Sequence, residues 1–557
     1  MGVIGLRLFK KRDAGKRFTK EEVSWIAYDW ANSVYATNIM AAIFPIYYAG
    51  IAGDLGNKWW GIGVSIASLV CAVLSPVVGA IADFKGYKKK ILAVFIAIGV
   101  VFTALMAFVG RWEWLLVGYV ISHIGFSGAC VIYDSFITDV TTDERMDRVS
   151  AWGYAMGYLG GSTIPFVISI VILLLTDFSL TAIKFSILIT SVWWAAFSIP
   201  ILLNVKQRHY VETPPSQLAK SAGKNLIDTA KRCITNRGLL IFLIAYFLYI
   251  DGVGTIISVS TNYGATLGLG STGMILALLV TQLVAVPCSI LFSKFAGRFG
   301  AIKMILFAIV MYFCICVVGF FMGRIVEPHQ LEYTALVRQS AATQQVDAAA
   351  KRDQKTWEQV VTDIVDNGKD VLAEDDRATA FAGVFSDIKA RLNDPKAIVY
   401  GFTDPAVRDR AVTAVAAIEA ELGGYVSDTR KQADYNAARS LAGSLFWVLA
   451  ALVGTVQGGI QALSRSYFGK LVPIERSAEY FGFYDIFGKF AAVIGPVLYA
   501  VFYMLTDRPS VGIISLLILF AGGALLLLLG RGQLERTERE IREANERAAL
   551  QKAEGEA

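Results

Sequence analysis

The feature that most constrains this chain is a series of about twelve apolar runs, each long enough to cross a bilayer as a helix. The chain has 557 residues, of which 55% are hydrophobic and 18% charged, and soluble domains do not repeat runs of this kind. Because backbone groups cannot stay unpaired in hydrocarbon, we expect an all-α membrane protein of twelve transmembrane helices. The runs lie near residues 23–50, 59–83, 91–110, 113–138, 149–176, 180–204, 238–268, 272–296, 301–323, 443–466, 480–505 and 509–530.

The basic residues gather in alternate loops. Seven Lys or Arg residues stand in the first twenty positions, and seven more lie between Lys206 and Arg237. The positive-inside rule therefore predicts that both termini are cytoplasmic. We accordingly interpret the net charge of +6 as a sign of topology in a lipid bilayer and expect no nucleic-acid partner. The short basic N-terminus favours a bacterial inner membrane over a vacuolar one.

The two halves of the chain resemble each other. A constant offset of 331 pairs Ser135 with Ser466 and Pro165 with Pro496. Earlier in the halves the offset is smaller, since Asp29 pairs with Asp251 at 222 and Gly86 with Gly300 at 214. About 110 residues are therefore inserted between the ninth and tenth runs. The expected parts are a basic N-terminal segment (1–22), a six-helix bundle (23–205), a cytoplasmic linker (206–237), helices seven to nine (238–323), an extracytoplasmic insertion (324–440), helices ten to twelve (441–531) and a charged tail (532–557).

The insertion is polar and rich in Ala, Asp, Arg and Lys. TWEQVVTDIVDNGKDVL and AVRDRAVTAVAAIEAEL within it have helical periodicity. We expect a helical cap without chemistry of its own, and the alternatives are docking of an extracytoplasmic protein partner or capture of substrate.

A short motif, GAIADFKGYKKK at 79–90, separates the second and third runs. It resembles the signature loop of the major facilitator superfamily, with Phe84 where a cation is expected directly after the Asp. Glycines permit close helix packing, and a carboxylate can face either the N-terminus of a helix or a basic residue where the two halves meet. The resemblance implies two pseudo-symmetric six-helix bundles and a conformational latch. Its expected members are Gly79, Asp83, Gly86, Lys88 and Lys89.

Three longer stretches narrow the resemblance. They are AYDWANSVYAT (27–37), AYFLYIDGVGTI (245–256) and QGGIQALSRSYFGKLVPIERSAEYFGFYDIFGKFAAVIGP (457–496). They are similar to the autophagy-related vacuolar effluxer-like family, whose fungal members are associated with amino-acid export from the vacuole. The resemblance implies a small-molecule transporter, and the insertion is a departure from the compact pattern of the family.

Ionisable groups inside the apolar runs are costly and usually face a water-filled cavity. Asp29 and Asp251 are repeat mates, and each carboxylate could bind a substrate ammonium or carry a coupling proton. The alternative is that each is held by a donor on a neighbouring helix. The expected solute and ion pathway comprises Asp29, Asn32, Ser33, Tyr249, Asp251, Thr255, Gln457, Gln461, Asp485 and Lys489.

Two further sets of charged or titratable groups have predicted roles. Arg465 is expected to form a gate with Asp134 and Asp485, while Asp485 and Lys489 are spaced to neutralise each other on one helix. His123, near the middle of the fourth run, is either a proton relay or an ordinary hydrogen-bonding residue.

These observations predict a secondary transporter that moves a small polar solute, most plausibly an amino acid, together with protons. GxxxxGK[ST] does not occur in the sequence, which argues against drive by ATP. We expect no cofactor, no metal site and no enzymatic activity. The open alternatives are a sugar, nucleoside or lysolipid transporter, and a sensor or assembly platform that acts through 324–440.

Overall fold

The structure is a computed structural model that describes residues 17–176, 179–212, 218–269, 271–352, 429–490, 493–506 and 508–555. Two compact units divide it. The first comprises residues Met1–Asn262, Thr272–Gly319 and Trp447–Ala557, and the second comprises Tyr263–Ser271 and Phe320–Phe446.

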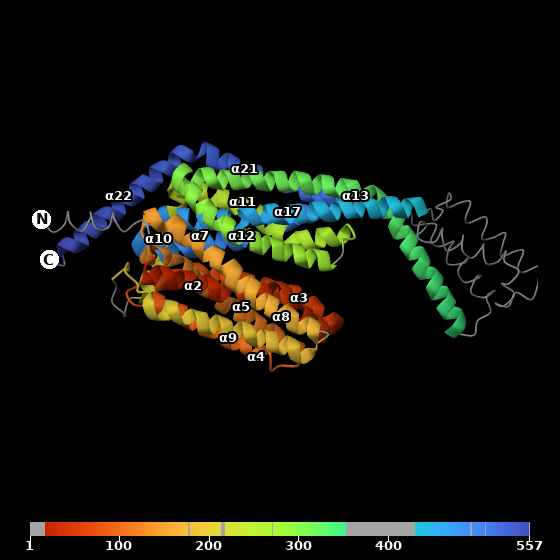
Figure 1. Cartoon of the computed structure of the whole chain (residues 1–557). Helices are drawn as coiled ribbons and strands as arrows, with labels where there is room; N and C mark the ends of the chain where they lie inside the picture. Colours follow the sequence, from red (N-terminus) through yellow and green to blue (C-terminus); the bar gives the residue numbers. More distant parts are fainter. Residues whose placement is uncertain are drawn as a thin grey trace, which may run out of the picture. The chain divides into compact units, whose positions relative to one another are not determined.

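The first half of the larger unit is a group of helices drawn red to yellow in Figure 1. Helix α4 packs against α5 and α9, and α2 packs against α7 and α9. At Gly125 of α5, a Cβ atom would lie 2.7 Å from the Cα atom of Gly99 in α4, so only glycines permit this helix approach. The elements are α2 (Lys20–Val34), η1 (Tyr35–Ala42), α3 (Ile43–Ala82), α4 (Lys88–Met106), α5 (Trp112–Ser135), α6 (Ile137–Val140), α7 (Asp143–Met156), η2 (Gly157–Thr163), α8 (Ile164–Leu175) and α9 (Leu180–Asn204).

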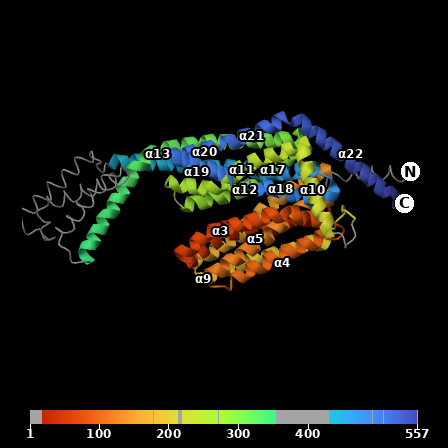
Figure 2. The same cartoon turned by 180° about the vertical axis from the view of Figure 1, so that it is seen from behind.

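The second half follows a linker that includes α10 (Leu218–Thr235). Figure 2 shows α10 and α18 from behind, where the two helices contact each other. We call the end of the larger unit that carries residues 205–237 the linker end. The remaining elements are α11 (Arg237–Thr266), α12 (Ser271–Phe299), α13 (Ala301–Arg352), α17 (Thr429–Lys470), η5 (Ile474–Arg476), α18 (Ser477–Phe490), α19 (Ile494–Thr506), α20 (Pro509–Ser515), α21 (Leu517–Leu529) and α22 (Arg531–Gly555).

Within the described residues, eleven helices are long and apolar enough to cross a membrane. This agrees with the predicted all-α membrane architecture. The first predicted span is interrupted, because α2 passes into the π-helix η1 before α3 begins. The expected break between residues 50 and 59 is absent, and α3 is helical throughout. That stretch contains glycines but no proline, and a glycine costs a helix only about 1 kcal/mol.

The start of α2 illustrates how local sequence sets an element boundary. The Thr19 side chain accepts a hydrogen bond from the Glu22 backbone N–H at 3.1 Å, and the Glu22 carboxylate accepts one from the Thr19 N–H at 2.8 Å. This capping box begins the helix that carries Asp29.

The duplication is also visible in the turns. Gly86 and Gly300, which are equivalent positions in the two halves, have φ of 77° and 92°. A side chain is strained in this left-handed region, so glycine is required at both turns.

The helices that contain the ninth and tenth runs continue into the segment predicted as the insertion, since α13 runs to Arg352 and α17 starts at Thr429. TWEQVVTDIVDNGKDVL and AVRDRAVTAVAAIEAEL lie outside the described residues, as does the basic N-terminal stretch up to residue 16.

Candidate functional site

At the linker end, Asp83 joins the two halves. Its carboxylate, just after α3, accepts hydrogen bonds from the backbone N–H groups of Ala478 at 2.9 Å and Glu479 at 2.8 Å. Both residues lie in the first turn of α18, where the positive end of the helix dipole favours an anion. Gly79 allows the approach, because a Cβ atom there would collide with the backbone oxygen of Ala478. Of the two partners that the motif allows for its carboxylate, a helix N-terminus or a basic residue, Asp83 accepts its hydrogen bonds from the helix N-terminus.

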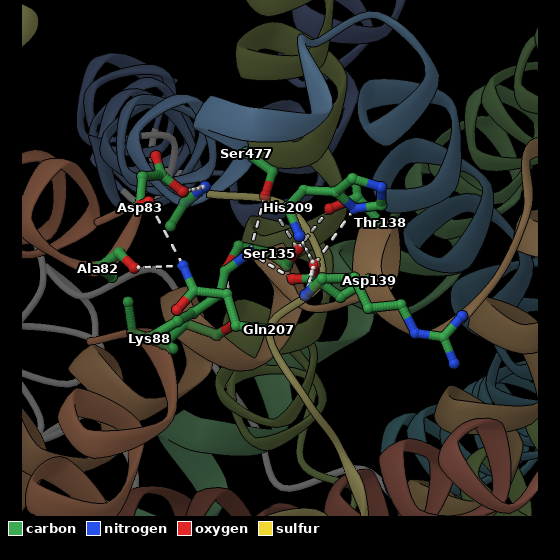
Figure 3. Close-up of polar contacts among 12 residues, drawn as sticks. Ala82, Asp83, Lys88, Ser135, Thr138, Asp139, Gln207, His209 and Ser477 are labelled. Carbon is green, nitrogen blue, oxygen red and sulfur yellow. Dashed lines mark hydrogen bonds and ion pairs between the residues drawn. The ribbon is translucent and has the colours of Figure 1, made fainter. Parts of the chain in front are cut away.

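Lys88 lies next to this contact and is fully buried. Its ammonium donates hydrogen bonds to the Asp139 carboxylate at 2.8 Å, the Ser477 hydroxyl at 2.8 Å and the Ser135 carbonyl at 3.3 Å (Figure 3). Ser477 belongs to the second half and the other two residues to the first. Lys88 thus contacts residues of both halves, whereas Lys89, the other lysine of the predicted latch, donates to the Leu203 carbonyl at 3.5 Å.

The linker is attached to the same cluster, which the sequence did not indicate. The second oxygen of Asp139 accepts the backbone N–H groups of Arg208 at 2.8 Å and His209 at 2.9 Å. The Gln207 amide donates to the carbonyls of Ala82 and Phe84, each at 3.1 Å (Figure 3). Asp139 therefore connects the buried Lys88 to the chain that links the two halves.

The ionisation of Asp83 is expected to make this contact between the halves depend on pH. Asp83 lies just beyond the apolar segment that ends at Ala82. Burial raises its pKa to about 7, although Lys88 and the two N–H donors act in the opposite direction. A water-exposed Asp has a pKa of about 3.9, so the closed latch holds a proton more tightly than an open one.

We therefore expect closure of the linker end to be most favourable below about pH 4 and to weaken as the pH rises through about 7. Distances between spin labels at the exposed positions Lys90 and Arg298 would report it. Asp83→Asn, which resembles the protonated carboxyl, should remove most of the pH dependence. An unchanged pH profile in this variant would contradict the assignment to Asp83.

A second group of contacts between the halves centres on Arg465 of α17. Its guanidinium donates to Asp134 of α5 at 2.9 Å and to Asp29 of α2 at 3.2 Å. It also donates to the Ser150 hydroxyl and carbonyl, both at 3.0 Å. Asp134 and Arg465 are equivalent positions in the repeat, separated by 331 residues. The predicted gate pair is thus in contact, and Asp29, which also accepts the Tyr133 hydroxyl at 2.7 Å, binds the same guanidinium directly.

A third contact between the halves was not predicted. Asp147 of α7 forms an ion pair with Lys470 of α17 at 2.8 Å and accepts a hydrogen bond from Ser466 at 2.7 Å. Three sets of polar contacts, around Asp83, Arg465 and Asp147, therefore join the halves toward the linker end.

The predicted contact between Asp485 and Arg465 is not formed in the structure. It forms an ion pair with Lys489, one helical turn away in α18, and accepts a hydrogen bond from Ser75 of α3 at 2.6 Å. Lys489 itself contacts the Ser75 hydroxyl at 3.2 Å. The i, i+4 spacing explains the pairing, because it brings the two side chains together without any movement of a second helix.

Asp251 belongs to α11 and is fully buried. Its side chain lies next to the first turn of α19. Its carboxylate accepts the Gly495 N–H at 2.9 Å and the Thr255 hydroxyl at 3.5 Å. A donor on a neighbouring helix thus holds it, which matches the structural alternative stated above. Nearby on α11, Tyr249 shares a 2.6 Å hydrogen bond with Ser464 of α17.

The remaining pathway candidates have varied surroundings. Asn32 lies 3.5 Å from the Cys130 sulfur, and Gln461 accepts the Tyr158 hydroxyl at 3.0 Å. Gln457 is buried on the same helix, and a Cβ atom at Gly157 would lie 2.7 Å from the Ser33 hydroxyl. His123 is buried, and its Nδ1 atom has no hydrogen-bond partner within the part of the chain that the structure describes.

Comparisons with known proteins identify the family. The model of the family described as "Vacuole effluxer Atg22 like" matches residues 62–333 and 444–541. The uncharacterized MFS-type transporter YxiO of Bacillus subtilis is 36% identical over 526 residues, which cover 92% of this chain and 95% of that protein. Autophagy-related protein 22 of Yarrowia lipolytica is 29% identical over 147 residues, 22% of this chain and 25% of that protein.

Among solved structures, a bacterial homologue of the iron transporter ferroportin in an outward-facing state aligns with 92% of this chain and 98% of its own, at 11% identity and a TM-score of 0.49. The family match and the full-length bacterial relative confirm the resemblance found in the sequence. The chain belongs to the vacuole effluxer Atg22-like family and is a multi-pass membrane transporter of the major facilitator type.

Proposed function

We propose that the protein is a secondary transporter that moves an amino acid by alternating access, coupled to protons. The observation that carries this proposal is the concentration of polar contacts between the halves toward one end, around Asp83, Arg465 and Asp147. A rocking transporter needs contacts that hold one end closed and can separate. Ion pairs and helix-end contacts meet this need, because water solvates the separated charges.

The linker end is assigned to the cytoplasm, from the distribution of Lys and Arg in the loops. In this assignment the structure is the state that is closed to the cytoplasm, with Gly79, Asp83, Gly86 and Lys88 as the latch and Arg465 with Asp134 as the gate. Location in a bacterial cell membrane is supported by the long match to a Bacillus subtilis protein.

An amino acid is the preferred solute because the pathway carries both charge signs. Lys489 is partly buried, with 18% of its side chain exposed, and can meet a carboxylate once it separates from Asp485. Asp29 and Asp251 offer carboxylates for an ammonium or a proton, and Asn32, Gln457 and Gln461 add amides. His123 is a candidate proton relay, because its Nδ1 atom meets no hydrogen-bond partner among the residues that the structure describes.

The test is counterflow in proteoliposomes with labelled amino acids, sugars and nucleosides, measured together with internal pH. We expect at least one amino acid to exchange. Asp251→Asn should abolish its proton-driven accumulation and leave exchange measurable, since the amide can still accept the Gly495 N–H. Asp434→Asn, at an exposed position, is the matched control and should behave as wild type. Proton-driven accumulation that survives in Asp251→Asn would exclude this residue as the coupling group.

A further inference from the structure

The guanidinium of Arg465 lies among three aromatic rings in addition to its two carboxylates. Its central carbon is 4.4 Å from the ring centre of Tyr154, 4.6 Å from that of Trp25 and 5.4 Å from that of Tyr133. Aromatic faces attract cations within about 6 Å. We define the cation cage as these three rings with Asp29 and Asp134.

Every residue of the cation cage belongs to the first half, on α2, α5 and α7, whereas Arg465 comes from α17 of the second half. The cage is therefore a complete cation site on one half, and its present occupant is a side chain of the other half. Its composition, two carboxylates behind aromatic faces, suits an organic ammonium or guanidinium group.

Contacts within the first half hold the cage together without Arg465. The Trp25 and Tyr133 rings stack with centres 4.5 Å apart, and the Trp25 indole N–H donates to the Tyr133 carbonyl at 2.8 Å. The Tyr133 hydroxyl donates to Asp29. Gly153 keeps the space open, because a Cβ atom there would lie 2.5 Å from an Asp29 oxygen and 3.0 Å from Arg465.

Separation of the halves removes Arg465 and leaves the two carboxylates of the cage without a cation. Carboxylates in such a setting require a new counter-charge or must take up protons. A solute that carries a cationic nitrogen supplies that charge. The aromatic rings attract such an organic cation more strongly than a hydrated metal cation or a sugar hydroxyl.

We propose that the cationic nitrogen of the transported solute binds in this cage when the linker end opens, and that Arg465 is a tethered competitor that replaces it when the end closes. This inference rests on the proposed transport function. It specifies the solute further: the ammonium or guanidinium group is required, and an uncharged or purely anionic analogue is excluded.

The first test measures binding alone and needs no transport. Arg465→Ala in nanodiscs is titrated with guanidinium chloride at millimolar concentration, against sodium chloride at equal ionic strength, and thermal stability is recorded. We expect guanidinium to bind the variant at least tenfold more tightly than wild type, whose cage is occupied. In the Arg465→Ala background, Tyr154→Leu should weaken binding about tenfold.

The matched control is the triple variant Asp29→Asn, Asp134→Asn, Arg465→Ala, which has the same cavity without the carboxylates and should show no response specific to guanidinium. If Arg465→Ala does not fold alone, growth and purification in guanidinium provide the same test, since a cage that binds the ion should rescue folding. A folded Arg465→Ala protein that ignores guanidinium would overturn the proposal.

The second test is counterflow by the wild-type protein with an exchanged amino acid and its α-hydroxy acid analogue, which lacks only the ammonium. We expect the amino acid alone to exchange. Equal exchange of the hydroxy acid would refute the cage as the solute's cation site while leaving the transport function standing. If no solute exchanges, the transport proposal fails, and the guanidinium titration still decides whether the cage binds cations.

Discussion

Replacing Asp139 by alanine is expected to lower the stability of the protein by about 3–5 kcal/mol, because it leaves the fully buried ammonium of Lys88 without its counter-charge. The Ser135 carbonyl and the Ser477 hydroxyl remain as acceptors, but neither is an anion. The linker also loses the carboxylate that accepts the N–H groups of Arg208 and His209. Thermal unfolding in detergent or nanodiscs would measure the loss.

Two controls separate charge from packing in this prediction. Glu212→Ala removes an ion pair with Lys85 in which both side chains are mostly exposed, so it should have no measurable effect. The double variant Lys88→Met, Asp139→Leu removes both charges together and should be clearly more stable than Asp139→Ala alone. If Asp139→Ala is as stable as wild type, Lys88 is not held by this carboxylate.

Replacing Arg465 by alanine is expected to open the linker end. In the closed state Asp29 and Asp134 would remain largely buried without a cation, at a cost of about 3–5 kcal/mol. Since each 1.4 kcal/mol is a factor of ten, the closed-to-open ratio should fall by roughly a hundredfold to several thousandfold. The closed-to-open ratio of Arg465→Lys should lie between those of wild type and Arg465→Ala, because one ammonium cannot reproduce the forked contacts of the guanidinium.

Spin labels at Lys90 and Arg298 would measure this shift as a larger fraction of molecules with a long distance between the two labels. Adding Asp29→Asn and Asp134→Asn to Arg465→Ala should restore part of the short population, because no unpaired charge is then buried. A distance distribution that is unchanged in Arg465→Ala would contradict the role of Arg465 as the gate.

The parts of the account that could be predicted from the sequence depend on local or repeated patterns. Apolar runs of about twenty residues predict membrane helices because the bilayer sets their length, and the glycines and Asp83 of the motif predict a contact with a helix end. The pair Asp485–Lys489 follows from helical spacing. The equivalence of Gly86 and Gly300 followed from the repeat and is matched by their shared positive φ.

Other parts could not be predicted, because they depend on which helices meet. Nothing near Asp139 in the sequence indicates that it pairs with Lys88, or that Asp147 meets Lys470 across 323 residues. The aromatic surroundings of Arg465 come from three separate helices, and the π-helix at Tyr35–Ala42 has no distinctive composition. The hydrogen bond from Gly495 to Asp251 forms only because the start of α19 packs beside the middle of α11, which neither segment reveals alone.

The most direct test of the central claim, that solute crosses only when the two halves separate at the linker end, is a reversible cross-link between them. Asp147 and Ser466 are in hydrogen-bond contact from opposite halves, so Asp147→Cys with Ser466→Cys places two thiols on facing helices, where oxidation can be used to cross-link the closed end. We predict that the oxidised double variant shows no amino-acid counterflow, that reduction restores it, and that the same treatments leave wild type unaffected. Undiminished counterflow in the fully oxidised protein would contradict the account.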